Sequence, residues 1–255
     1  MLKIVLLGGG NVAQHLLEVF SKTPTTTVVQ CYNRNLSTIE NFQKHTEITN
    51  NLEQLKPADV YIIAIKDDAI ADFSRSLPLT NKLVVHTSGN VPMLTLADKN
   101  RRGVFYPLQS FSKEKEVNFS KIPICIEAEN EADLKTLQTL AEAISQHVYT
   151  ITSEQRKTLH VGAVFVNNFV NQLYQIGSEI CEENKIPFEI LQPLISETSE
   201  KIKTLTPLEA QTGPAKREDT ATINSHLKLL KNEDFKDIYK LITKVIIKTH
   251  GREKL

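Results

Sequence analysis

The stretch that decides the fold is residues 2–13, which read LKIVLLGGGNVA. Its first part is an apolar run of the length of a β-strand, and three glycines follow without a gap. Apolar residues then recur at helical spacing as far as Phe20, and a second β-branched run covers residues 27–32. A strand, a glycine turn, a helix and a strand within about thirty residues form the βαβ unit that binds dinucleotides.

The small residues of the turn each fit nucleotide binding. Gly8 allows a sharp turn off the strand, and Gly10 lets a pyrophosphate approach the backbone amides at the helix N-terminus. Ala13 stands where helix and strand must pack closely. The alternative interpretation is a tight turn in an α/β protein that binds no nucleotide.

The end of the second predicted strand indicates which nucleotide is bound. NAD sites usually carry Asp or Glu there to hold the ribose 2′-hydroxyl, whereas residues 32–35 read YNRN, without an acid. An Arg can pair with a 2′-phosphate through two hydrogen bonds, and a carboxylate would repel it. We therefore predict NADP, with NAD less favoured, unless Arg34 is only a solvated loop residue.

Composition excludes several classes of protein. The chain has 255 residues, and its 30 basic residues balance 30 acidic ones, which disfavours binding to nucleic acid or an anionic membrane through net charge. No stretch approaches the ~20 apolar residues of a membrane span, and the N-terminal apolar run is too short for a signal peptide. Cys31, Cys125 and Cys181 are far apart, as expected for reduced thiols in a cytoplasmic protein.

Strand and helix patterns alternate as far as residue 151. The clearest strand is 58–65, whose nearly continuous apolar character is typical of a parallel strand covered on both faces. We predict a doubly wound, Rossmann-type, mostly parallel sheet in a domain of residues 1–151, followed by an all-α domain of residues 152–255. Further strands are expected at residue 48 and at 82–86, 103–106, 122–126 and 147–151, with helices at 36–42 and 132–144 and a helix beginning at 66–68.

Ligands of open parallel sheets bind beyond the carboxyl ends of the strands. We therefore expect the residues there to contact the cofactor. They are Gly8, Gly9, Gly10, Asn11, Val12, Asn33, Arg34, Ala64, Ile65, Lys66 and Ser88.

Beyond residue 151 the pattern predicts only helices. Thr152 and Gln155 form a capping box, and a helix that is apolar on most faces follows as far as about residue 184. A helix apolar nearly all round is expected to be buried, here as the core of the second domain. Further helices are predicted from residue 187 to about 205 with a kink at Pro193, after Thr206, and over 219–230 and 232–250. The last one carries Leu241, Ile242, Val245 and Ile246, which indicate a dimer contact or packing within the domain.

Three polar clusters are candidates for chemistry. In the first, His86 and Ser88 follow a strand beside the expected nicotinamide, where they could pass a proton to a carbonyl, unless Ser88 only caps a turn. In the second, His160, Asn167, Asn168 and Asn171 recur at helical spacing, so they line an interdomain cleft or make structural hydrogen bonds.

The third cluster is residues 212–219, followed by His226. Its Lys216 and Arg217 could hold an anionic group, although an ordinary solvated loop explains them at least as well. His86, His160 and His226 match no local spacing of metal ligands, so no metal is expected.

Together these motifs resemble a known family. It comprises predicted NADP oxidoreductases that join a Rossmann-like domain to a helical domain of unknown function, distantly related to pyrroline-5-carboxylate reductase, ketopantoate reductase and the β-hydroxyacid dehydrogenases. The resemblance implies bound NADP, a helical C-terminal domain and a homodimer, and it supplies no substrate. It covers essentially the whole chain and rests on residues 8–13, 86–89, 107–111, 160–168 and 212–226.

One position departs from the more distant relatives. The β-hydroxyacid dehydrogenases use a catalytic Lys one turn before an Asn pair on the interdomain helix, and Val164 stands at that position here. Because valine cannot donate a proton, His160 is the nearest replacement. The resemblance also equates Ser88-Gly89 with the serine turn that holds substrate in those enzymes.

We therefore expect an NADP(H)-dependent oxidoreductase that transfers a hydride to or from a small carbonyl, imine or hydroxyl compound. His160 or His86 would be the acid/base, and Ser88 and Asn168 would orient the substrate. Dimerisation is expected through the C-terminal helices. The alternative is a non-catalytic protein that binds NADP as a sensor or interaction module.

Overall fold

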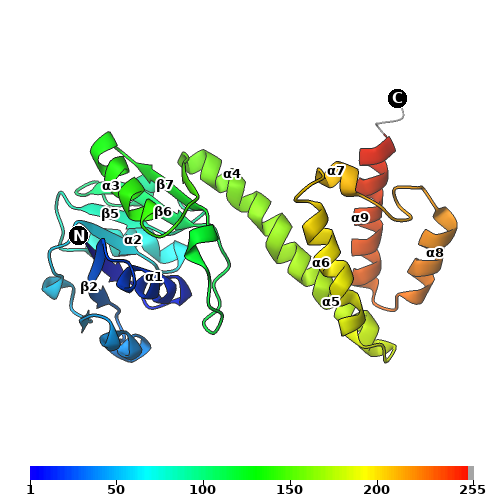
Figure 1. Cartoon of the computed structure of the whole chain (residues 1–255), viewed down its shortest axis with the longest axis horizontal. Coiled ribbons are helices and arrows are strands. Elements are labelled where there is room, and N and C mark those ends of the chain that lie inside the picture. Colours follow the sequence, from blue (N-terminus) through cyan, green and yellow to red (C-terminus); the bar gives the residue numbers. More distant parts are fainter. Residues whose placement is uncertain (252–255) are drawn as a thin grey trace. The chain divides into compact units, whose positions relative to one another are not determined.

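The computed structural model describes residues 1–251, which divide into a first compact unit, Met1–Val164, and a second that begins at Phe165. The first unit holds an eight-stranded sheet in the order β3-β2-β1-β4-β5-β6-β7-β8. Figure 1 labels β2, β5, β6 and β7 of this sheet. Among the strand pairs of this sheet, β6 and β7 are antiparallel and all the others are parallel. The predicted doubly wound, mostly parallel sheet is thus confirmed. The strands are β1 (Leu2–Leu7), β2 (Thr26–Tyr32), β3 (Ile48–Thr49), β4 (Val60–Ile63), β5 (Leu83–His86), β6 (Arg101–Pro107), β7 (Ile124–Ala128) and β8 (Val148–Thr150).

Helices cover both faces of the sheet because its central strands are apolar on both. Ile4 and Leu6 of β1 join the core formed with α1 (Asn11–Ser21) and α3 (Glu131–Glu142). Val5 and Leu7 point the other way, into the core formed with α2 (Ile70–Ser76). Each fully buried side chain of this kind contributes ~1.5–3 kcal/mol. Burial of this strand therefore fixes where the glycine turn begins.

Short 3-10 turns replace the helix predicted at 36–42. One covers Leu36–Thr38 and the next Glu40–Lys44. The Asn35 side chain accepts a hydrogen bond from the Ser37 amide, and this local bond competes with the α-helical pattern. Similar turns cover Leu52–Gln54, Asp67–Ala69, Met93–Thr95 and Phe119–Lys121.

The long helix after residue 151 is present, and it is interrupted. It consists of α4 (Ser153–Ala163), a π-helical segment Val164–Phe169, and α5 (Val170–Glu183). The predicted capping box of Thr152 and Gln155 is confirmed, whereas the sequence did not predict the π-helical segment. The first unit includes α4, which the sequence analysis placed in the second domain.

The prediction that this helix is buried is wrong for the chain by itself. Val161, Phe165 and Val166 expose 55%, 62% and 75% of their surface. An apolar pattern on all faces predicts that a helix will be buried, but it does not identify the surface that buries it.

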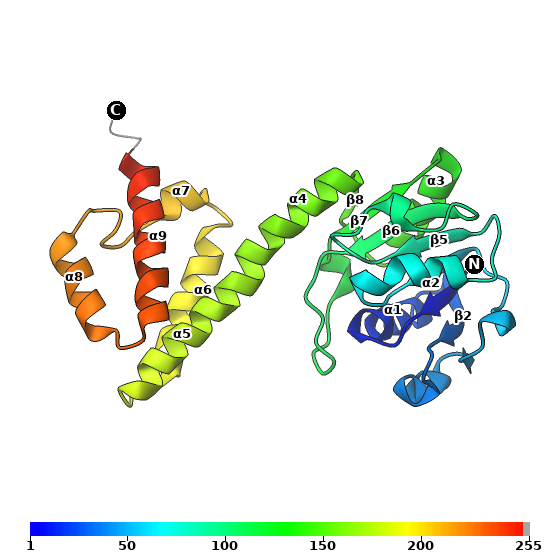
Figure 2. The same cartoon turned by 180° about the vertical axis from the view of Figure 1, so that it is seen from behind.

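The second unit is entirely helical over its described residues. After α5 come a 3-10 turn (Phe188–Leu191), α6 (Gln192–Lys201), α7 (Pro207–Ala210), α8 (Thr220–Leu229) and α9 (Glu233–Gly251). In both views α5 and α6 lie side by side (Figures 1 and 2). The predicted kink at Pro193 is wrong, since this proline lies in the first turn of α6, where its missing N–H costs nothing. Within residues 1–251, no helix is both long and apolar enough to cross a membrane.

Candidate functional site

A cavity of about 1160 Å³ opens at the carboxyl ends of β1, β2 and β4. This is the point where the strand order reverses, at which doubly wound sheets bind their ligands. The structure brings every predicted cofactor residue except Ser88 to its lining: Gly8, Gly9, Gly10, Asn11, Val12, Asn33, Arg34, Ala64, Ile65 and Lys66. Residues that the sequence analysis did not propose complete the wall, among them Tyr32, Thr38, Asp72, Phe73, Thr87, Gln109 and Phe111.

Two glycines of the turn have different roles: Gly8 is required by the backbone, and Gly10 leaves room for a ligand. Gly8 has φ +137°, and a Cβ there would lie 2.1 Å from the Ala64 carbonyl oxygen, so only glycine fits. A Cβ on Gly10 would meet no heavy atom within 4 Å. Gly10 is also the N-cap of α1, and no side chain caps that helix. The free amides at the N-terminus of α1 and the open space before them fit a pyrophosphate.

Positive charge lines the cavity without a neutralising partner. Arg34 and Lys66 make no ion pair with any described residue, whereas the cavity's Asp72 is paired with Arg75. The end of β2 carries no acid, and the Asn33 side chain donates a hydrogen bond to the Asn35 carbonyl. The residues present therefore suit an anionic dinucleotide.

A loop from β6 reaches over α1 at the edge of the cavity. The Asn11 side chain donates to the Phe111 carbonyl at 2.8 Å, and Nε2 of His15 lies 2.9 Å from the Ser112 carbonyl oxygen. The Phe111 ring packs between His15 and Phe119, with centroids 5.1 and 5.9 Å away. These contacts hold Phe111 against the cofactor cavity, which the sequence alone did not indicate.

The turn after β5 is held by its own side chains. His86 is completely buried, and its Nδ1 accepts a hydrogen bond from the Ser88 amide at 3.1 Å. Burial, with the nearby positive charge of Arg156, lowers the pKa of His86 to about 3. His86 therefore stays neutral near neutral pH, which argues against it as the acid/base. Its role is to shape the turn.

Ser88 caps the turn after β5, which was the alternative to a role in proton transfer. Its Oγ accepts hydrogen bonds from the amides of Asn90 and Val91, at 3.1 and 3.0 Å. These two bonds use the hydroxyl as an acceptor and leave its one donor unused, while the Ser88 side chain is buried and outside the cavity lining.

His160 is paired with a tyrosine that the sequence analysis missed. Nδ1 of His160 lies 3.2 Å from the Tyr106 hydroxyl, and the two rings meet edge to face. Burial raises the pKa of Tyr106 to about 12, so its hydroxyl is protonated at neutral pH. The available signal was the position of Tyr106 at the carboxyl end of a predicted strand, beside the strand that ends at His86.

A buried ion pair fixes the helix that carries His160. Arg156 is 1% exposed, pairs with Glu127 of β7 and donates to the Val91 carbonyl at 2.7 Å. Ser153 also donates to Glu127, from its backbone amide at 2.9 Å. Since Arg156 and His160 are four residues apart on α4, they share one face of the helix. The ion pair thus sets the position of His160.

The asparagines of the second cluster are not buried by their own chain. Asn167 and Asn168 lie in the π-helical segment and Asn171 in α5, and all are exposed. Their interpretation as polar groups on a helix buried within its own chain is therefore wrong, because in the single chain this helix is exposed. The role of Asn168 in orienting a substrate stays a prediction.

The third cluster is a loop with ordinary caps. Gly213 has φ +103°, and Asp219 caps α8 by accepting a hydrogen bond from the Thr222 amide. His226 lies 2.8 Å from the Tyr239 hydroxyl through its Nδ1. Within residues 1–251, no three His, Cys, Asp or Glu side chains gather as metal ligands would.

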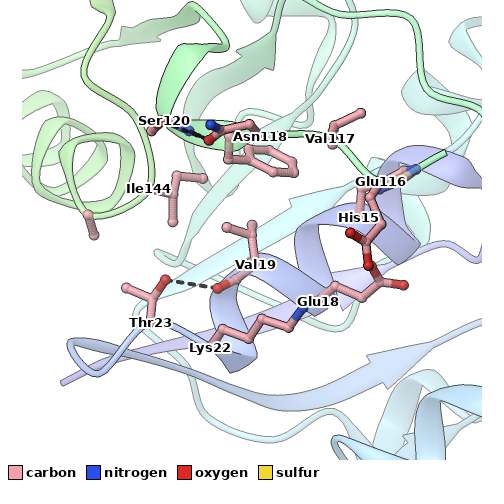
Figure 3. Close-up of a pocket in the computed structure, with 12 residues that line it drawn as sticks. His15, Glu18, Val19, Lys22, Thr23, Glu116, Val117, Asn118, Ser120 and Ile144 are labelled. Carbon is pink, nitrogen blue, oxygen red and sulfur yellow. Dashed lines mark hydrogen bonds between the residues drawn. The ribbon is translucent and has the colours of Figure 1, made fainter.

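A second cavity, of about 290 Å³, lies between α1 and the segment 116–120 (Figure 3). Charges of both signs line it, from Glu18, Lys22 and Glu116. It shares no lining residue with the larger cavity. It is therefore not part of the candidate cofactor site.

Comparison with known proteins adds the family. Residues 3–90 match the family described as NADP oxidoreductase, coenzyme F420-dependent, and residues 122–246 match a domain of unknown function, DUF2520. A crystal structure of a proposed NADP oxidoreductase from Bacteroides fragilis is 36% identical, with a TM-score of 0.88 over 97% of this chain and 98% of that one. The chain belongs to the family that joins an NADP oxidoreductase domain to DUF2520. The resemblance stated from the motifs is thereby confirmed, and the chain stands among the NAD(P)-dependent oxidoreductases.

More distant structures share the fold of this DUF2520 protein. A Thermotoga maritima protein is 22% identical, with a TM-score of 0.77, over 95% of this chain and 99% of that one. An imine reductase from Myxococcus stipitatus in complex with NADP+ is 12% identical, with a TM-score of 0.64, over 98% of this chain and 93% of that one. Among curated proteins, none matches the chain.

Proposed function

We propose that this DUF2520 protein is an NADPH-dependent reductase of a small compound with a C=O or C=N bond, or the reverse dehydrogenase. The observation that supports this most is the large cavity in front of the uncapped glycine turn, with the Tyr106–His160 pair at the same carboxyl end of the sheet. Thr87 lines the cavity, and Gly89, two residues further along, has no room for a Cβ because Tyr106 and His160 stand against it. Cofactor binding and proton transfer thus meet at one end of the sheet.

The residues divide into binding and proton-transfer roles. When bound, the cofactor supplies or accepts the hydride. The α1 N-terminus and Lys66 bind its phosphates, and the Ser88 hydroxyl donates a hydrogen bond to the substrate. Of the two histidines, His160 is the one that takes part in proton transfer, because it is half-buried and connected to Tyr106, whereas His86 is completely buried.

NADP is preferred to NAD because of Arg34. This guanidinium lines the cavity, is exposed, and makes no ion pair among the described residues. An exposed charge-assisted contact to a 2′-phosphate is worth about 1.5 kcal/mol, or roughly tenfold in affinity. Replacing Arg34 with Gln should therefore weaken NADPH binding about tenfold and leave NADH binding unchanged. Lys44→Gln, at an exposed cation outside the cavity, is the matched control.

Activity is tested by following the loss of NADPH absorbance with two probes, the cyclic imine pyrroline and the ketone cyclohexanone. The proposal expects oxidation of NADPH with at least one of them. It also expects His160→Ala to lower turnover while the dissociation constant for NADPH stays within about twofold. Tight NADPH binding without oxidation in either assay would instead favour the sensor or interaction protein.

We also propose that the chain forms a homodimer through its second unit. Between Phe165 and His250, the buried apolar side chains are only Ile176, Cys181 and Ala215 among the residues that the structure describes. A helical unit with so small a core of its own needs a covering surface, and a second copy supplies an equally apolar one. Large exposed side chains lie on α5, α6 and α9: Leu173, Tyr174, Ile180, Leu194, Leu241, Ile242 and Val245.

Size-exclusion chromatography with light scattering tests the dimer, whose mass should be twice the chain mass of 28.7 kDa. A paired substitution, Leu241→Lys with Val245→Lys, should reduce the mass toward that of one chain. A wild-type mass of one chain would reject this proposal.

A further inference from the structure

We infer that Tyr106 is the residue that gives the proton to the reduced substrate, and that His160 relays protons to it from solvent. This inference rests on the proposed reductase function and assigns a catalytic residue to it. The group that protonates the substrate is then Tyr106, near the end of strand β6, and His160 on helix α4 exchanges protons with solvent.

The first observation is the geometry of a three-residue cluster. The Tyr106 hydroxyl and Nδ1 of His160 lie 3.2 Å apart, within reach of proton transfer. A Cβ built on Gly89 would stand 2.8 Å from each of these two atoms and 2.7 Å from Cζ of Tyr106. Gly89 therefore lets the turn after β5 pack directly against the pair, where any side chain would displace them. Gly89 closely follows Thr87, which lines the cofactor cavity, and Tyr106 lies just beyond the residue that pairs with His86, so the pair is at the same carboxyl end of the sheet as the cavity.

The second observation is the order of the two groups from the inside outward. Tyr106 is 9% exposed and packs with Val104, Met93 and Cys125, whereas His160 is only half-buried. The inner group must meet the substrate without admitting water, and the outer group must exchange protons with water. The phenol suits the first task, and the imidazole suits the second through its remaining Nε2 atom.

The charges around the pair keep the phenol protonated. Burial raises the pKa of Tyr106 most, Cys125 and Asp67 raise it further, and Arg156 lowers it. A phenol held neutral in this way donates its proton only as negative charge develops on the substrate heteroatom. His160 is the titratable group in contact with it, so recharging goes through Nδ1.

Hydride adds to the substrate carbon, the π electrons of the C=O or C=N bond move to the heteroatom, and the heteroatom takes the proton from Tyr106 Oη. His160 in its Nδ1–H tautomer donates from Nδ1 to Oη while its unprotonated Nε2 takes a proton from water, and exchange with solvent then returns the ring to the Nδ1–H tautomer. The net proton comes from solvent, and the cofactor leaves in its oxidised form.

Three variants test the relay against a control. Tyr106→Phe keeps the ring and removes the hydroxyl, Gly89→Ala places a methyl group against both partners, and His160→Gln removes the relay. Tyr149→Phe, at a tyrosine that is 52% exposed on β8, is the control. NADPH affinity, turnover of pyrroline and cyclohexanone, and NMR of nitrogen-labelled histidine in the cofactor-free protein are measured for each.

The relay predicts that Tyr106→Phe lowers kcat about 100-fold while KM and NADPH affinity change less than about threefold. It also predicts that the His160 Nδ1 signal, identified by its absence in His160→Gln, moves in Tyr106→Phe and in Gly89→Ala and stays in place in Tyr149→Phe. Wild-type turnover retained in Tyr106→Phe would overturn this inference and leave the proposed reductase function intact. Failure of the wild type to oxidise NADPH with either probe would overturn both.

Discussion

Replacing Gly10 with Ala tests whether the space before α1 belongs to a ligand. A Cβ at this position meets no protein atom within 4 Å, and the backbone φ of −81° suits alanine. The free protein should therefore keep its stability or gain about 0.4–1 kcal/mol from the smaller entropy of the unfolded chain. The methyl group would, however, occupy the place where the pyrophosphate approaches the amides of α1.

The expected loss of NADPH binding free energy is that of placing one extra methyl group in an occupied site. Such overpacking costs about 1–3 kcal/mol, which weakens NADPH binding roughly 5- to 150-fold. A fluorescence titration with NADPH gives the affinity, and thermal unfolding without cofactor gives the stability. Gly8→Ala is the contrasting variant, because its Cβ would clash with the Ala64 carbonyl at 2.1 Å and its φ is positive, so it should lose stability itself. An unchanged NADPH affinity in Gly10→Ala would refute the assignment of this space to the cofactor.

Two further predictions concern the elements that hold the site. Arg156→Met should leave the partly buried Glu127 without its cationic partner and lower stability by about 3–5 kcal/mol, seen as a fall in Tm of roughly 6–20 °C. A change below about 2 °C would contradict the role given to this ion pair. The pKa of His86 falls from 6.5 to about 3 on folding, so its contribution to stability is complete above pH 6.5 and is lost as the pH drops toward 3. At about pH 5 the loss is about 2 kcal/mol, and His86→Gln should show a correspondingly flatter dependence of Tm on pH, whereas equal slopes in both proteins would contradict the buried, neutral His86.

The N-terminal half could be predicted from sequence because its signals are local. The strand at 2–7, the glycine turn and the helix after it are continuous in the chain, and the structure has them as β1, Gly8–Gly10 and α1. The edge strand at Ile48 and the capping box at Thr152 were predicted in the same way. Each rests on backbone requirements that a few neighbouring residues satisfy.

The proton-carrying pair could not be predicted, because it depends on register between distant elements. Tyr106 meets His160 only because β6 continues past the end of β5 and because the Arg156–Glu127 ion pair holds α4 against the sheet. Helical spacing instead connected His160 with the asparagines that follow it. The π-helical segment begins after His160 and contains Asn167 and Asn168, and a π-helix changes which residues share a face.

The exposure of the C-terminal helices was also beyond the sequence pattern. Residues such as Leu173, Leu241 and Val245 have the spacing of a core face, and in the single chain they are exposed. Apolar periodicity predicts that a helix face will be buried, but it does not identify whether the same chain or a partner buries it.

The central claim is that the first unit binds an NADP dinucleotide at the glycine turn, and it is tested most directly by titrating the purified protein with NADPH and, separately, with NADH. Binding is followed by the change in nicotinamide fluorescence. The arrangement of Gly10, the α1 N-terminus and Arg34 predicts saturable binding of both, with NADPH favoured about tenfold. Equal, weak binding of the two would contradict the assignment of the cavity to NADP and would leave only the fold in place.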